Sequence, residues 1–122
     1  MTAESRAFLL APAQRRVMSH SLVNYRDVDA VGGGLHFLRD ALDCSNLGVS
    51  VLDVDAGWSG KPHDHADEGE EEVYVLVEGA ATVTVGDEAV ELSAGDALRV
   101  DPETTRQIDT EESSLFVIAG AP

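Results

Sequence analysis

Two histidines and a glutamate are the residues whose types and spacing are best suited to bind a metal ion. His63 and His65 are two positions apart, so on an extended strand both imidazoles would project from the same face. Glu72 follows after a loop and begins a β-rich run, where its carboxylate could meet the imidazoles across a strand pair. Such a set of two imidazoles and one carboxylate accepts Fe, Mn, Ni, Cu or Zn. The residues alone leave a second interpretation open, in which the histidines lie in a surface turn and the glutamates in a solvated acidic loop.

The elements that must position these side chains are predicted to be short β-strands. After Cys44, apolar and β-branched runs are separated by turn residues at intervals of roughly 8 to 12 residues. These runs do not alternate with helices, which argues against a parallel α/β sheet. The pattern predicts an all-β antiparallel sandwich or barrel, with strands near 47–54, 73–77, 82–85, 89–92, 97–100, 106–108 and 115–119.

The beginning of the chain differs in charge from the remainder. Residues 1–17 carry three arginines and one glutamate, whereas residues 18–122 carry 5 basic and 22 acidic side chains. We therefore expect residues 1–17 to be a loose N-terminal extension. A second methionine lies at this change, so Met18 is an alternative to Met1 as the start of translation.

An N-terminal arm is expected between this extension and the strands. We assign the arm to residues 18–45, packing on a barrel of residues 46–122. Leu35, Leu38 and Leu42 are spaced as on one face of a short helix or in an irregular apolar segment. The predicted fold is therefore a β-barrel preceded by a short irregular or helical segment.

Length and composition exclude several classes of protein. With 122 residues, 43% of them hydrophobic and 25% charged, the chain is expected to form one globular domain. No apolar run approaches the roughly 20 residues that cross a bilayer, and no secretory signal is recognisable. The single cysteine, Cys44, cannot form an internal disulfide, so a reducing compartment, the cytoplasm, is expected.

The charge balance bears on the partners. Eight basic and 23 acidic residues give a net charge of −15, and such a field repels phosphate backbones and anionic lipids. Neither nucleic acid nor a membrane is therefore an expected partner. The acidity is consistent with a cation-binding protein and with a surface adapted to high salt. Because the carboxylates are dispersed and Lys61 is the single lysine, we favour a halophilic type of surface.

The segment from Gly57 to Gly79 resembles the first motif of the cupin family. That motif consists of a glycine, five residues, His-x-His, a short gap, a glutamate, six residues and a glycine. In this sequence His63, His65 and Glu72 occupy the three ligand positions of the motif. The resemblance extends over about residues 46 to 122.

The gap in the motif is longer here than usual. Six residues separate His65 from Glu72, where three or four are usual in the family. Glu70 and Glu71 are therefore alternatives to Glu72, although the spacing back from Gly79 selects Glu72.

The second cupin motif is only partly kept. When this motif is aligned to the sequence, its first glycine corresponds to Gly95, and Arg106 takes the position of the family's histidine. The motif is also changed at three further positions, with Asp101 for proline, Glu103 for glycine and Thr110 for asparagine. Because arginine has no lone pair to offer a metal, the resemblance implies three protein ligands rather than four.

The resemblance implies a double-stranded β-helix, or jelly roll, with its site inside the mouth of the barrel. There His63, His65 and Glu72 would bind a divalent transition metal, and Tyr74 would line the same face as Glu72 by strand parity. Arg106 would point to the place of the missing histidine. It would either bind an anionic group of a substrate beside the metal or replace the metal by pairing with Glu72.

The implied function is that of a small cupin that binds a metal and a small organic ligand. If Arg106 binds the ligand, the ligand is anionic. Oxygenase or isomerase chemistry would fit such a site, with Tyr74 and Arg106 as substrate-binding residues. The alternative is a non-catalytic binding or sensor module, and a third is a structural protein whose pocket Arg106 closes. Small cupins commonly pair through sheet edges, so a homodimer is expected.

Overall fold

The computed structural model describes residues 19–122. The predicted extension at 1–17 and the choice between Met1 and Met18 lie outside these residues. The elements are, in chain order, a 3-10 helix (Tyr25–Asp27), β1 (Leu35–Phe37), α1 (Arg39–Leu42), β2 (Gly48–Val54), β3 (Glu71–Glu78), β4 (Ala80–Val85), β5 (Glu88–Ser93), β6 (Ala97–Val100), β7 (Arg106–Thr110) and β8 (Ser114–Ala121).

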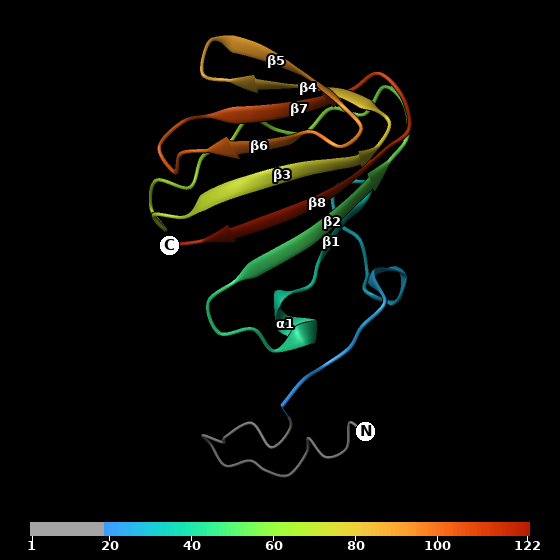
Figure 1. Cartoon of the computed structure of the whole chain (residues 1–122), viewed down its shortest axis with the longest axis vertical. Coiled ribbons are helices and arrows are strands. Elements are labelled where there is room, and N and C mark those ends of the chain that lie inside the picture. Colours follow the sequence, from blue (N-terminus) through green and yellow to red (C-terminus); the bar gives the residue numbers. More distant parts are fainter. Residues whose placement is uncertain (1–18) are drawn as a thin grey trace.

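The strands form two antiparallel sheets, which confirms the predicted all-β fold. The larger sheet has the strand order β1-β2-β8-β3-β6, and the smaller has the order β5-β4-β7. Figure 1 shows β5, β4 and β7 at one end of the molecule and β2 with α1 towards the other. The seven predicted strands all occur, with boundaries that differ by a few residues.

Alternation along the strands directs one face of each sheet into a shared core. In the larger sheet Leu52 of β2, Phe116 of β8 and Leu76 of β3 lie side by side in register and are at most 1% exposed. Val83 of β4 pairs with Ile108 of β7, and both belong to the same apolar cluster. Complete burial of a side chain of this size contributes about 1.5–3 kcal/mol, so this layer holds the two sheets together.

The segment that contains Leu35, Leu38 and Leu42 is not one short helix. Residues Leu35–Phe37 form β1, which pairs with β2, and the helix α1 is limited to Arg39–Leu42. Residues 35–37 form a strand rather than a helix because the edge of β2 offers unpaired backbone groups. In this strand Leu35 lies opposite the buried Leu52. Part of the predicted arm therefore adds a strand to the larger sheet.

The histidine segment does not pair with the strand of Glu72. His63 forms an antiparallel bridge with Arg106, and Ser59 forms another with Asp109, so the segment lies along β7 of the smaller sheet. Both edges of β3 are occupied, by β6 and by β8. The expected meeting across a strand pair is therefore wrong, and the histidines reach Glu72 from the opposite sheet.

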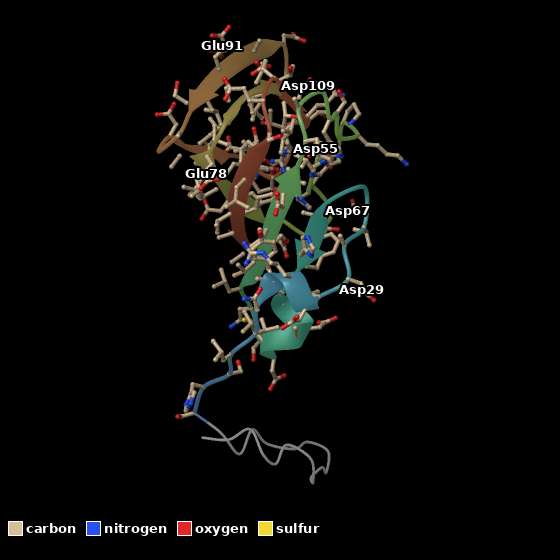
Figure 2. The ribbon with its side chains drawn as sticks, turned by 90° about the vertical axis from the view of Figure 1, so that its right-hand side faces the viewer. Asp29, Asp55, Asp67, Glu78, Glu91 and Asp109 are labelled. Atoms are coloured by element: carbon tan, nitrogen blue, oxygen red, sulfur yellow. The ribbon has the colours of Figure 1, made fainter. Side chains whose placement is uncertain are left out.

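Acidic side chains occur from one end of the described part of the molecule to the other. Figure 2 labels six of them, from Glu91 on β5 to Asp29 near the other end of the molecule. Along residues 19–122, no helix has both the length and the apolar character needed to cross a membrane.

Candidate metal centre

The two histidines and the glutamate converge although they come from different sheets. One potential ligand atom from each of His63, His65 and Glu72 lies within 4.8 Å of the other two. The imidazole rings meet edge to face, with their centroids 5.1 Å apart and an interplanar angle of 84°. His63 is exposed, whereas His65 and Glu72 are half-buried, so the group opens towards solvent on one side.

His65 is held between two carboxylates. Its Nδ1 lies 3.3 Å from Oε1 of Glu68, and its Nε2 lies 3.3 Å from Oε1 of Glu72. A neutral imidazole that donates its Nδ1 proton to Glu68 leaves the Nε2 lone pair directed to the centre, an arrangement typical of metal-binding histidines.

Glu68 was not recognised as part of the site from the sequence, where it belonged to an undivided acidic run. The feature of the sequence that could have identified Glu68 is its position three residues after His65. The turn between them is closed by a hydrogen bond of 2.9 Å from the Gly69 amide to the His65 carbonyl, and this turn brings residues at that spacing together.

Glu72 is the carboxylate of the acidic run that faces the imidazoles. Its neighbour Glu71 alternates to the outer face of β3, where it is half-exposed and bonds to Arg99 at 2.8 Å. Glu70 pairs instead with Arg39 at 3.1 Å. The geometry therefore singles out Glu72 from the three alternatives.

A single oxygen of Glu72 has two further partners. Tyr74 donates its phenolic proton to Oε1 at 2.5 Å, and Arg106 donates to the same atom at 3.3 Å. Tyr74 and Glu72 therefore share one face, as strand parity predicts. Burial, reinforced by the nearby Glu72 carboxylate, raises the pKa of Tyr74 well above its usual value, so the phenol stays protonated and acts as a donor.

Arg106 lies at the inner end of the site and is completely buried. Besides Glu72, its guanidinium donates to the Asp101 carbonyl at 2.6 Å. Its Nε has no hydrogen-bond partner among the described residues. The ion pair with Glu72 that the sequence allowed is thus formed, and the substrate-binding roles of Tyr74 and Arg106 stay predictions.

His36 and Trp58 lie outside the candidate metal centre and contribute to packing. His36 bonds through Nδ1 to the Val28 carbonyl at 2.7 Å and meets the edge of Tyr25, away from the group that His65 belongs to. Trp58 donates from Nε1 to the Gly32 carbonyl at 2.9 Å and packs against the core.

A groove of about 470 Å³ begins at His65 and Glu72 and extends across the larger sheet. Its walls come from β1, α1, β2, β8 and the loop before β3. A volume of this size suits a small organic molecule. The candidate ligands therefore lie at one end of a space that a ligand can enter.

The chemistry of the three side chains fits a divalent transition metal. Imidazole nitrogen and carboxylate oxygen are ligands that this class of ion accepts, and three protein ligands leave coordination positions for water or substrate. Arg106, which the resemblance puts at the fourth ligand position, is completely buried, and its guanidinium cannot coordinate a metal. The site is therefore suited to a three-ligand ion.

The family model of the cupin domain matches residues 50–119, more than half of the chain, and these residues include the three candidate ligands. The chain belongs to the cupin family. Its two sheets are accordingly the double-stranded β-helix that the sequence resemblance implied.

Three relatives illustrate the range of similarity to this cupin. An uncharacterized protein of Streptomyces coelicolor is 35% identical over 93 residues, which cover 75% of this chain and 82% of the relative. A cupin protein of Bacteroides fragilis has a TM-score of 0.65 at 29% identity, over 82% of this chain and 86% of that chain. KdgF from a Halomonas species has a TM-score of 0.69 at 24% identity, over 86% and 94% of the two chains, and this likeness shows the fold alone.

Proposed function

We propose that this cupin binds a divalent transition metal through His63, His65 and Glu72, with a small organic ligand in the adjoining groove. The convergence of the three ligand atoms within 4.8 Å supports the metal site. The groove that starts at His65 and Glu72 supports the ligand, because a molecule in it would lie beside the metal.

The chain's own residues prepare the site for the ion. Glu68 orients the His65 ring, and Tyr74 directs the Glu72 carboxylate by donating to Oε1, the oxygen that Arg106 pairs with in the metal-free protein. A bound metal would supply Lewis acidity and open coordination positions. Oxygenase or isomerase activity on the ligand is the catalytic form of this proposal, with Tyr74 and Arg106 at the inner end of the substrate site.

The second candidate is a non-catalytic binding or sensor module, in which Arg106 replaces the metal by pairing with Glu72. The observation in its favour is the ion pair between them, which already supplies the carboxylate with a positive partner. In this form the groove captures a small molecule without any reaction.

Metal binding is tested on protein purified without chelators. Elemental analysis and calorimetric titration with Zn²⁺, Mn²⁺ and Fe²⁺ should give about one ion per chain in the parent and none in His63→Ala. His20→Ala is the matched control, because it removes an exposed imidazole outside the group. Absence of any bound ion in the parent, or equal binding by both variants, contradicts the metal site.

Turnover distinguishes the two candidate functions. Screening of small organic acids and sugars with the metal-loaded protein should reveal oxygen consumption or an isomerised product that Glu72→Ala abolishes. Ligands that raise the melting temperature without any product favour the binding module instead.

Assembly and location are part of the same proposal. We infer a homodimer in the cytoplasm, with neither nucleic acid nor a membrane as a partner, and the net charge of −15 supports the exclusion of both. Light scattering in high salt measures the mass, and a monomeric mass contradicts the dimer.

A further inference from the structure

The floor of the groove is a row of residues without bulky side chains. In register across three strands, Gly48 of β2 pairs with Gly120 of β8, which in turn pairs with Glu72 of β3. The neighbouring row on the same face contains Ser50 and Ile118. The two glycines therefore let neighbouring side chains lie close against the sheet beside the candidate metal centre.

Side chains lie close above both glycines. A Cβ at Gly48 would lie 2.5 Å from Nη2 of Arg39, and a Cβ at Gly120 would lie 2.9 Å from Cγ of Glu72. The guanidinium of Arg39, which comes from α1, lies directly over Gly48 of β2, where a larger side chain would displace it.

Arg39 gives the groove its positive charge. Among the described residues that line the groove, it is the only lysine or arginine. Its side chain is 40% exposed and donates from Nη2 to Glu70 at 3.1 Å. A guanidinium carries five N–H donors, so this contact alone does not saturate it. Arg106, by contrast, is buried behind Glu72.

Phe37 supplies an apolar surface at the same place. It belongs to β1, pairs with Ser50 in the register and lines the groove, and it is 57% exposed. An exposed ring and an accessible guanidinium in one groove are suited to a ligand that has an apolar body and one anionic group.

We propose that the groove binds a small monocarboxylate, whose carboxylate pairs with Arg39 and whose apolar part lies on Phe37. Glu70 occupies the place of the ligand's carboxylate in the free protein and is displaced when the ligand binds. The proposal deepens the proposed function and rests on it for the position of the ligand beside the metal.

The charges of the groove select for a single negative group. Besides the Arg39 partner Glu70, the lining includes the carboxylates of Asp40, Glu68 and Glu72. Each added negative charge is repelled by these carboxylates, so a phosphate or a dicarboxylate is disfavoured more strongly than a monocarboxylate that exchanges with Glu70 on Arg39.

The test is an NMR titration with benzoate and acetate, followed at the amide resonances of Gly48 and Gly120. Metal is removed beforehand on a chelating resin, and the titration is repeated with Zn²⁺-loaded protein. Benzoate should shift both glycine amides. Benzamide, the uncharged isostere, should bind at least about tenfold more weakly, because it lacks the charge that pairs with Arg39.

Three variants and one control, Arg26→Met, assign the roles. Arg39→Met should raise the Kd for benzoate at least about tenfold, while Arg26→Met, which loses a cation stacked on Tyr25 outside the groove, should leave it within about twofold. Glu70→Gln should lower the Kd at least about threefold, because it removes the competing carboxylate. Phe37→Ala should weaken benzoate but not acetate.

The outcomes separate this proposal from the metal site. Equal affinity in Arg39→Met and Arg26→Met, weaker binding in Glu70→Gln, or the absence of glycine shifts with either carboxylate overturns the inference. Failure of Zn²⁺ to shift the His63 and His65 ring resonances contradicts the metal site alone, and the benzoate titration of the metal-free protein then still decides the inference.

Discussion

Nη1 of Arg106 lies 3.3 Å from Oε1 of Glu72, and the arginine side chain that makes this contact is completely buried. Glu72 is also the one carboxylate of the three candidate metal ligands. The guanidinium and a metal ion would therefore share the same anion. Arg106 stabilises Glu72 in the metal-free protein and opposes the approach of a second positive charge.

Replacement of Arg106 should destabilise the metal-free protein. Arg106→Met leaves the Glu72 carboxylate without its charged partner in a largely buried position, so the free energy of unfolding should fall by about 3 kcal/mol. Urea denaturation measures this value. The control is Arg99→Met, whose ion pairs with Glu71 and Asp101 are more than half exposed, so its loss should be much smaller. Equal losses in the two variants contradict the stabilising role.

The same replacement should strengthen metal binding. Without the guanidinium, Zn²⁺ no longer competes with a fixed positive charge, and the Kd for Zn²⁺ should fall about tenfold or more. Calorimetric titration of parent and Arg106→Met gives the ratio. A higher Kd in the variant shows instead that Arg106 is needed to orient Glu72 for the metal.

A methyl group on the floor of the groove should disturb the site. A Cβ at Gly120 would approach Cγ of Glu72 to 2.9 Å and the Glu71 carbonyl to 3.0 Å. Gly120→Ala should therefore lower stability by about 1–3 kcal/mol and weaken Zn²⁺ binding. The control is Ala119→Val on the other face of β8, which should leave the Kd for Zn²⁺ unchanged. An unchanged Kd for Zn²⁺ in Gly120→Ala contradicts the prediction, because Glu72 then moves aside without cost to the site.

Alkaline conditions should destabilise the metal-free protein through Tyr74. Burial and the Glu72 carboxylate raise the pKa of its phenol in the folded state, so above about pH 10 the unfolded state loses this proton first. The unfolded state then binds fewer protons, and the free energy of unfolding falls as pH rises. Urea denaturation between about pH 9 and about pH 11 should show this slope in the parent.

The second tyrosine must be separated from this effect. Tyr25 donates to Asp53 at 2.7 Å, and this hydrogen bond also raises the pKa of Tyr25. Tyr25→Phe should keep most of the alkaline slope, whereas Tyr74→Phe should remove most of it. The reverse result assigns the slope to Tyr25.

Salt should stabilise the fold. The net charge of −15 is spread over the surface, so mutual repulsion of carboxylates opposes the compact state until ions screen it. The melting temperature should rise when NaCl is increased from about 0.1 M to about 2 M. Choline chloride at the same concentrations distinguishes screening from sodium binding, and a melting temperature independent of both salts contradicts the halophilic interpretation.

Much of the fold could be predicted because strand formation has a local signal. The continuous apolar run of β8 predicted a strand, whose side chains then alternate in burial as strand geometry requires, and turn residues mark the ends of the strands. The missed strand β1 has no such signal over its three residues. It forms because the edge of β2 is free, which depends on the order of strands in the sheet.

The sequence by itself determined the strand pattern, the acidic surface and the three side chains that can bind a metal, because residue type and short spacing carry that information. Only the tertiary structure decided that the histidines reach Glu72 from the opposite sheet, that Arg106 takes a place beside it, and that Arg39 faces the same groove. Arg39 and Glu70 are 31 positions apart in the sequence, and Arg106 and Glu72 are 34 positions apart. These contacts depend on the register and order of paired strands, which are set by long-range hydrogen bonds and core packing rather than by local spacing.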